Sequence, residues 1–271
     1  MSLRVARLRR VLAGAVLGLG LAYGITVGGL YAAQRSLVFP APAGFAELPP
    51  GYDRITFDSA GGLALAAAWR PPASGKPTVL FFHGNGDSWA GGARAMQALA
   101  ETGYGVMLPE YRGYGTNPGQ PGEQEFYRDG HAALDWLGAQ GIRADRVVLV
   151  GNSIGSGTAT QLAAERRVAA LILVSPFASL SDLVAEKFPW LPGRWLVRDR
   201  FDNAAKLGRV SAPVLVLHGT ADTMIPAAHA RRLARAQPRA RLVLVSDADH
   251  DLAYLPRAQQ AEAEWLAQAV R

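Results

Sequence analysis

Residues 147–157 constrain the fold of this chain more than any other stretch. An apolar, largely β-branched run enters Ser153, and Gly151 and Gly155 stand two positions before and after it. A segment of helical character follows, so the order predicts a buried strand, a very tight turn and a helix, with the serine hydroxyl raised at the end of a sheet. Glycine is needed on both sides because the neighbouring chain passes too close for a side chain. An ordinary glycine-rich connection has the same pattern, and the rest of the chain must decide between the two.

Apolar runs alternate with helical segments on both sides of this stretch. The later runs are continuously apolar, which is typical of parallel strands buried on both faces. Gly61 and Gly62, between the first two runs, predict an antiparallel hairpin. The fold class is therefore α/β, with an eight-stranded, mostly parallel sheet, helices on both faces and a site at the carboxyl ends of the strands. The expected strands are residues 54–58, 63–70, 78–83, 104–108, 147–150, 171–175, 214–218 and 241–246, and the expected helices are 89–101, 123–139, 153–166, 226–237 and 256–269.

Residues 176–213 form the longest interruption of this alternation. The insert carries several prolines and five aromatic residues, Phe177, Phe188, Trp190, Trp195 and Phe201. Such a segment between two strands predicts a small cap over the site. The rings also fit a second interpretation, in which they only pack the insert onto the domain.

The N-terminal part has the pattern of a membrane anchor. Residues 1–10 form a basic tail, and residues 11–33 contain no charge, enough for a helix of about 34 Å. Cleavage after Ala33 would place Tyr31 at the third position before the cut, a poor site, so an uncleaved signal anchor is favoured over a signal peptide. The arginines precede the span and only Arg35 follows it closely, which predicts a cytoplasmic N-terminus. In a bacterium, the domain would then lie in the periplasm, held by the inner membrane.

The sequence also predicts the domain boundaries and a contact between anchor helices. Residues 34–53 are rich in Pro and Ala and are read as a connector, and residues 54–271 as the globular domain with its cap insert at 176–213. Gly14 and Gly18, and likewise Gly20, Gly24 and Gly28, are four residues apart, a spacing that lets membrane helices approach and predicts a homodimer. The alternative is that glycine is simply frequent in this span.

Charge and cysteine content exclude several classes of function. The formal net charge is +6, and the four arginines of the tail supply four of those charges, which leaves +2 on residues 11–271. No basic run interleaved with aromatics follows, so a nucleic-acid partner is not expected. The chain has no cysteine, which excludes disulfides, a thiol nucleophile and cysteine-based metal sites.

A serine nucleophile requires a base and a carboxylate that orients the base. His250 is the histidine in a loop late enough to return over the site, after the last expected strand. Asp222 follows the strand at 214–218 and is the expected acid, with Asp247, Asp249 and Asp251 as rivals beside the histidine. The oxyanion of a tetrahedral intermediate needs backbone N–H donors. We expect one from Ile154, the residue after the serine, and one from Asn85 in the His-Gly-Asn-Gly turn at 83–86.

Taken in order, these motifs resemble the α/β-hydrolase fold family over about residues 52–271. The resemblance rests on the turn at 83–86, Gly151–Gly155, the His-Gly-Thr-Ala-Asp segment at 218–222 and His250. The apolar anchor and the Tyr-Arg-Gly-Tyr-Gly segment at 111–115 are similar to a membrane-anchored subgroup, which includes uncharacterised bacterial hydrolases and eukaryotic protein depalmitoylases. The resemblance implies hydrolysis of acyl esters or thioesters through an acyl-enzyme, without metal or organic cofactor. Membrane tethering and an aromatic cap favour a lipophilic substrate.

Two other functions fit the same fold. One is a serine peptidase, although the chain offers no clear acidic pair to hold a peptide amine. The other is a binding protein without catalytic activity, because a fold does not determine a function.

Overall fold

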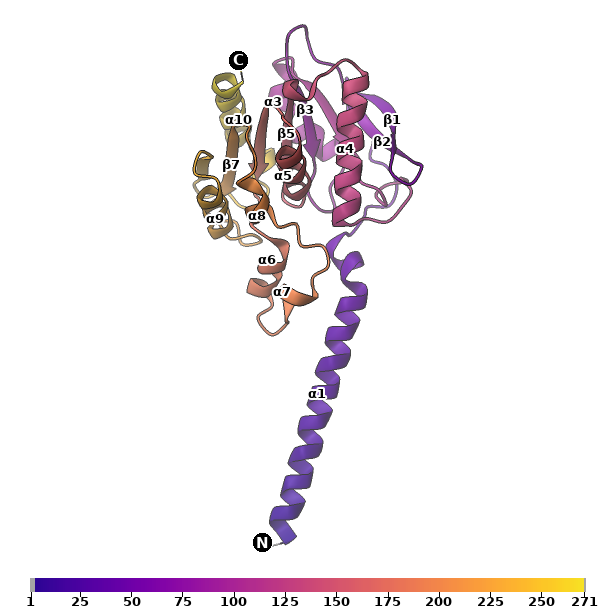
Figure 1. The fold of residues 1–271 in the computed structure, drawn as a ribbon, viewed down its shortest axis with the longest axis vertical. Coiled ribbons are helices and arrows are strands. Elements are labelled where there is room, and N and C mark those ends of the chain that lie inside the picture. The colour runs from indigo at the N-terminus through magenta and orange to yellow at the C-terminus, as the bar shows by residue number, and fades with distance from the viewer. Residues whose placement is uncertain (1–2, 271) are drawn as a thin grey trace.

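The computed structural model describes residues 3–270. A single long helix projects from an α/β domain, and the cap lies beside the domain end of this helix (Figure 1). The helix, α1 (Leu3–Val38), is long and apolar enough to cross a membrane, a property that fits an anchor or a signal sequence. It extends past residue 33 into the expected connector and ends shortly before Pro40, because the residue before a proline disfavours helical geometry.

The eight expected strands all form, in one sheet with the order β1-β2-β4-β3-β5-β6-β7-β8. The first two strands form the expected hairpin, β2 also pairs antiparallel with β4, and every other pairing is parallel. The mostly parallel sheet expected from the sequence is thus confirmed. The strands are β1 (Asp53–Ser59), β2 (Leu63–Arg70), β3 (Thr78–Phe82), β4 (Gly105–Pro109), β5 (Val147–Asn152), β6 (Ala170–Val174), β7 (Val214–Gly219) and β8 (Arg241–Val245).

Helices cover both faces of the sheet and enclose two apolar cores. One core lies under α4 (Glu123–Ala139), α5 (Gly155–Glu165), α8 (Asn203–Leu207) and α9 (Ala228–Ala236). The other lies under α2 (Trp89–Ala95), α3 (Gln97–Glu101) and α10 (Pro256–Ala269). One helix was expected over residues 89–101, but the structure has two, separated at Met96. Two 3₁₀ turns complete the chain, η1 (Ala144–Arg146) and η2 (Leu252–Tyr254).

The insert at 176–213 folds into α6 (Leu180–Lys187), α7 (Gly193–Leu196) and α8. Its aromatic residues divide into two groups. Phe177 and Phe201 are buried, and the Phe201 ring packs against Phe126 and Tyr127 of α4 with ring centroids 6.4 and 5.9 Å apart, so it attaches the insert to the domain. Phe188, Trp190 and Trp195 are exposed. The packing interpretation therefore holds for the buried rings, and a cap over the site stays a prediction.

The anchor glycines face open space. A Cβ added at Gly14, Gly18, Gly20, Gly24 or Gly28 would meet nothing within 4 Å among the described residues. A homodimer through these glycines stays a prediction.

Candidate active site

Ser153 stands on the sharp turn between β5 and α5. Its φ is 51°, in the left-handed region that costs a non-glycine residue on the order of 1–3 kcal/mol. A Cβ at Gly155 would lie 2.1 Å from the Phe82 carbonyl oxygen, and one at Gly151 would lie 2.5 Å from the Gly155 carbonyl oxygen. Both glycines are therefore needed because backbone fills the space of a side chain. The strand, tight turn and helix follow the expected order.

The structure brings together the three residues expected to form a triad. His250 Nδ1 lies 2.8 Å from Asp222 Oδ2, and His250 Nε2 lies 3.0 Å from Ser153 Oγ. The loops that carry Asp222 and His250 are joined, since the Ala221 N–H donates to the Ala248 carbonyl at 2.9 Å. The imidazole can thus accept the serine proton on one nitrogen while the carboxylate holds the other.

Asp222 is held as an anion. Its side chain is fully buried, and Oδ1 accepts the N–H groups of Met224 and Ile225 at 2.9 and 2.8 Å. Burial acts to raise the pKa of Asp222, but the contacts from His218 and His250 and the Ile225 N–H outweigh it and leave the pKa far below its usual range. A carboxylate in this state stabilises a positive charge on His250.

The rival carboxylates lie elsewhere. Asp247, Asp249 and Asp251 are exposed, and within residues 3–270 none of their carboxylates makes an ion pair or a hydrogen bond with the His250 ring. Asp249 Oδ1 instead accepts the Asp251 N–H at 3.2 Å. Asp222 is therefore the carboxylate that orients the histidine.

The turn after β3 lies beside the serine. A Cβ at Gly84 would stand 3.8 Å from Ser153 Cβ. The Asn85 side chain holds the turn, because it donates to the Val38 carbonyl at 2.5 Å and accepts from the Tyr114 hydroxyl at 2.7 Å. In the described part of the chain, neither the Asn85 nor the Ile154 N–H donates to a backbone carbonyl. The role of these two N–H groups as oxyanion donors stays a prediction.

Sequence reasoning missed the buried support of this turn. His83 Nε2 lies 3.6 Å from Glu110 Oε2, and the Tyr111 hydroxyl donates to the His83 carbonyl at 2.8 Å. Burial acts to lower the pKa of His83, but its contacts with Glu110 and the Gly84 carbonyl and the charge of Asp87 together outweigh burial and raise the pKa above the usual value. The sequence signal for this support was the Glu-Tyr pair at the end of the buried fourth strand, because a buried carboxylate needs a partner. His218 behind Asp222 was also missed as a supporting residue.

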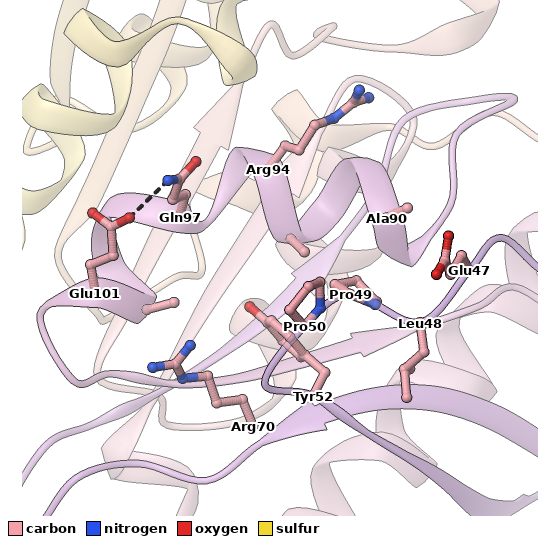
Figure 2. Close-up of a pocket in the computed structure, with 12 residues that line it drawn as sticks. Glu47, Leu48, Pro49, Pro50, Tyr52, Arg70, Ala90, Arg94, Gln97 and Glu101 are labelled. Atoms are coloured by element: carbon pink, nitrogen blue, oxygen red, sulfur yellow. Dashed lines mark hydrogen bonds between the residues drawn. The ribbon is translucent and has the colours of Figure 1, made fainter.

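No metal-binding cluster accompanies the triad. Among residues 3–270, no three His, Cys, Asp or Glu side chains are grouped to hold a metal ion. A surface pocket of about 570 Å³ lies over α2 and α3, away from Ser153. Figure 2 shows it, with the Gln97–Glu101 hydrogen bond on one wall. None of the triad residues lines this pocket.

Comparison with known proteins agrees with the geometry. Residues 77–200 match the family model of the alpha/beta hydrolase fold, and residues 194–269 match that of the TAP-like proteins. An uncharacterised protein of Mycobacterium tuberculosis is 37% identical over 232 residues, 82% of each chain. The alpha/beta hydrolase domain-containing protein WAV2 of Arabidopsis thaliana is 30% identical over 78% of each chain. The solved esterase Pf2001 of Pyrococcus furiosus superposes with a TM-score of 0.70 at 21% identity, over 85% of this chain and 97% of that one. The chain therefore belongs to the α/β-hydrolase fold family.

Proposed function

We propose that this protein is a serine hydrolase that cleaves carboxylic ester or thioester bonds of acyl substrates through an acyl-enzyme. The observation that carries the proposal is the position of His250, within hydrogen-bond distance of both Ser153 Oγ and Asp222 Oδ2. Structural likeness to esterases supports the same class. The triad uses no metal or organic cofactor in this chemistry.

Each residue has a defined role in the proposed reaction. Ser153 Oγ attacks the acyl carbon while His250 Nε2 accepts its proton, and the N–H groups of Asn85 and Ile154 bind the oxyanion. The imidazolium then protonates the leaving alkoxide or thiolate as the carbon–oxygen or carbon–sulfur bond breaks. Water, deprotonated by His250, attacks the acyl-enzyme, and the acid leaves as the proton returns to Ser153. Asp222 keeps the imidazole oriented throughout.

A chain-length series of p-nitrophenyl esters and acyl thioesters tests the proposal. We expect turnover by the wild type, and a loss in Ser153→Ala on the order of 10⁴-fold or more. Wild-type activity in Ser153→Ala would exclude Ser153 as nucleophile. Release of amino acids from short peptides without ester hydrolysis would favour the peptidase alternative, and absence of any turnover or fluorophosphonate labelling would favour the binding protein.

We also propose that α1 is retained as an anchor that holds the domain in the periplasm at the inner membrane. Contacts between α1 and the cap support retention. Gln34 Oε1 accepts the Arg198 N–H at 2.9 Å, and the Arg198 guanidinium lies 4.2 Å from the centre of the Tyr31 ring. A cleaved signal peptide would leave these cap groups without partners. Detection of an N-terminal epitope on the membrane-bound protein tests the retention.

A further inference from the structure

The cap is attached to α1 over a stretch that belongs to the expected membrane span. The Tyr23 hydroxyl donates to the Trp190 carbonyl at 2.9 Å, and the Gln34 side-chain amide donates to the Leu196 carbonyl at 3.4 Å. Tyr23 and Gln34 are eleven residues apart, about 17 Å along a helix. The cap thus lies beside α1 as far back as Tyr23, ten residues before residue 33, where the uncharged span was expected to end.

The length of the uncharged segment argues against a cap that lies wholly in water. With the cap outside the bilayer, only residues 11–22 would remain in it, about 18 Å of helix, and a hydrocarbon core of about 30 Å would be left uncrossed. With the whole uncharged segment in the bilayer, the level of Tyr23 and Trp190 lies about 15 Å below that of Ala33. An α1 that spans the membrane therefore carries the end of the cap into it.

The end of the cap has a composition that fits contact with a membrane. The exposed fractions of Phe188, Trp190 and Trp195 are 48%, 52% and 81%. Large exposed aromatic side chains are unusual on a surface in water and are typical of membrane interfaces. The neighbouring Arg194 is paired with Asp182 at 3.2 Å, so its charge is partly compensated. We call Phe188, Trp190 and Trp195 the cap tip.

An apolar groove of about 570 Å³ separates α1 from the cap, a volume in the range of ligand pockets. Val27 and Leu30 form part of the α1 wall, and Leu191 and Leu196 part of the cap wall. At the end nearest the domain the groove is lined by Val38, whose carbonyl accepts the Asn85 side chain. One end of the groove thus includes Trp190 of the cap, and the other end includes Val38, which is hydrogen-bonded to the turn that carries an expected oxyanion donor.

We propose that the cap tip is inserted in the membrane leaflet on the side of the domain, and that the groove takes one acyl chain of a bilayer phospholipid and guides it toward Ser153. Insertion of the cap tip is independent of the chemistry at Ser153. The use of the groove rests on the proposed function, because it assigns the groove to the acyl part of the substrate.

Fluorescence quenching tests the insertion. The full-length protein is reconstituted in phosphatidylcholine vesicles with or without bromine atoms on the acyl chains. We expect brominated lipid to quench the tryptophan fluorescence of the wild type. Most of this quenching should be absent from the Trp190→Phe, Trp195→Phe double variant. Trp136→Phe, on α4, is the control and should keep the loss. Equal bromine-dependent loss in all three proteins would overturn the insertion.

A groove-filling variant tests the acyl site. In Val27→Trp, we expect the ratio of the rate on p-nitrophenyl palmitate in vesicles to the rate on p-nitrophenyl butyrate to fall about tenfold or more. Ile25→Trp, an exposed position at the same depth, is the matched control and should keep the wild-type ratio. An unchanged ratio in Val27→Trp would overturn the acyl site. A wild type inactive on both esters would overturn the proposed function and the groove's role with it, while the quenching result would still decide the insertion.

Discussion

The imidazole of His218 lies behind the carboxylate of Asp222, with Nε2 3.4 Å from Oδ2, the same oxygen that faces His250. The same nitrogen lies 2.7 Å from the Ile225 carbonyl, and the Ile225 N–H donates to the other oxygen of Asp222. His218 therefore supports both the carboxylate and the loop that carries it. We infer that it is a positioning residue, which acts on the reaction through Asp222.

Replacement of His218 should lower turnover more than it affects binding. We expect His218→Leu to reduce kcat by about tenfold to a hundredfold with little change in KM, because a carboxylate that is free to move no longer orients His250. His218→Gln, which keeps a side-chain donor, should recover part of the loss. Steady-state kinetics on p-nitrophenyl butyrate measures both. A tenfold or larger rise of KM with unchanged kcat in His218→Leu would contradict a positioning role.

The turn at Ser153 should not tolerate a methyl group at Gly155. Because a Cβ there would overlap the Phe82 carbonyl, we expect Gly155→Ala to destabilise the fold by more than about 3 kcal/mol. Gly138→Ala is the matched control. A Cβ at this position of α4 meets nothing within 4 Å, so it should stabilise the protein by about 0.5–1 kcal/mol. Thermal unfolding compares the two, and equal Tm values would show that the turn has room.

A buried glutamate should make stability depend on pH. Glu262 of α10 is 1% exposed, both its oxygens lack a hydrogen-bond partner in the described structure, and burial raises its pKa to about 8. Below the unfolded value, about 4.5, the group is protonated in both states and has no effect on pH dependence. Between pH 4.5 and 8 the carboxyl ionises in the unfolded chain but not in the folded protein, so the free energy of unfolding falls as pH rises. The loss is complete above pH 8, where it amounts to at most about 5 kcal/mol.

Glu262→Gln tests this dependence. We expect the variant to match the wild type near pH 4 and to have the higher Tm at pH 9, because the amide never ionises. Glu264→Gln, two positions along on the exposed side of α10, is the control. A constant difference in Tm between Glu262→Gln and the wild type over this pH range would contradict a carboxyl kept neutral by burial.

Removal of only one partner of the buried Arg112–Asp129 ion pair should destabilise the fold. Arg112 Nε and one terminal nitrogen donate to the two Asp129 oxygens at 2.7 and 2.5 Å, and the Ser59 hydroxyl donates to the same carboxylate. Both partners are buried, so we expect Arg112→Met to destabilise the fold by about 3–5 kcal/mol by leaving an unpaired buried charge. Adding Asp129→Leu should recover much of this loss in denaturant unfolding. No recovery would show that the arginine acts through packing.

Much of this fold could be predicted because its strands and its anchor are each encoded by one short stretch of sequence. Each buried parallel strand is one continuous apolar run, and the span from residue 11 to 33 lacks charge. The attachment of the cap to α1 was not predictable, because the Tyr23–Trp190 contact joins residues 167 positions apart. Burial of Glu262 had a local signal, since Ala258 and Leu266 stand four residues away on each side and share its helix face.

The triad could be predicted because its members follow strands in a fixed order at one edge of the sheet. Choosing Asp222 over Asp249 needed only the rule that the acid follows the strand before the base. The roles of Glu110 and His218 depend on which side chains meet in the interior. Sequence spacing does not carry that information, because His83 and Glu110 are distant in the chain and adjacent only after β3 and β4 pair.

The proposed reaction requires Ser153 to be the nucleophile that becomes acylated during turnover. Intact-protein mass spectrometry after incubation with a fluorophosphonate, followed by peptide mapping, measures whether Ser153 is the reactive nucleophile. We predict one adduct per chain on the peptide that contains Ser153, no adduct in Ser153→Ala, and much slower labelling in His250→Ala. Adduct formation at another residue, or equal labelling of Ser153→Ala and the wild type, would contradict the assignment of Ser153 as the nucleophile.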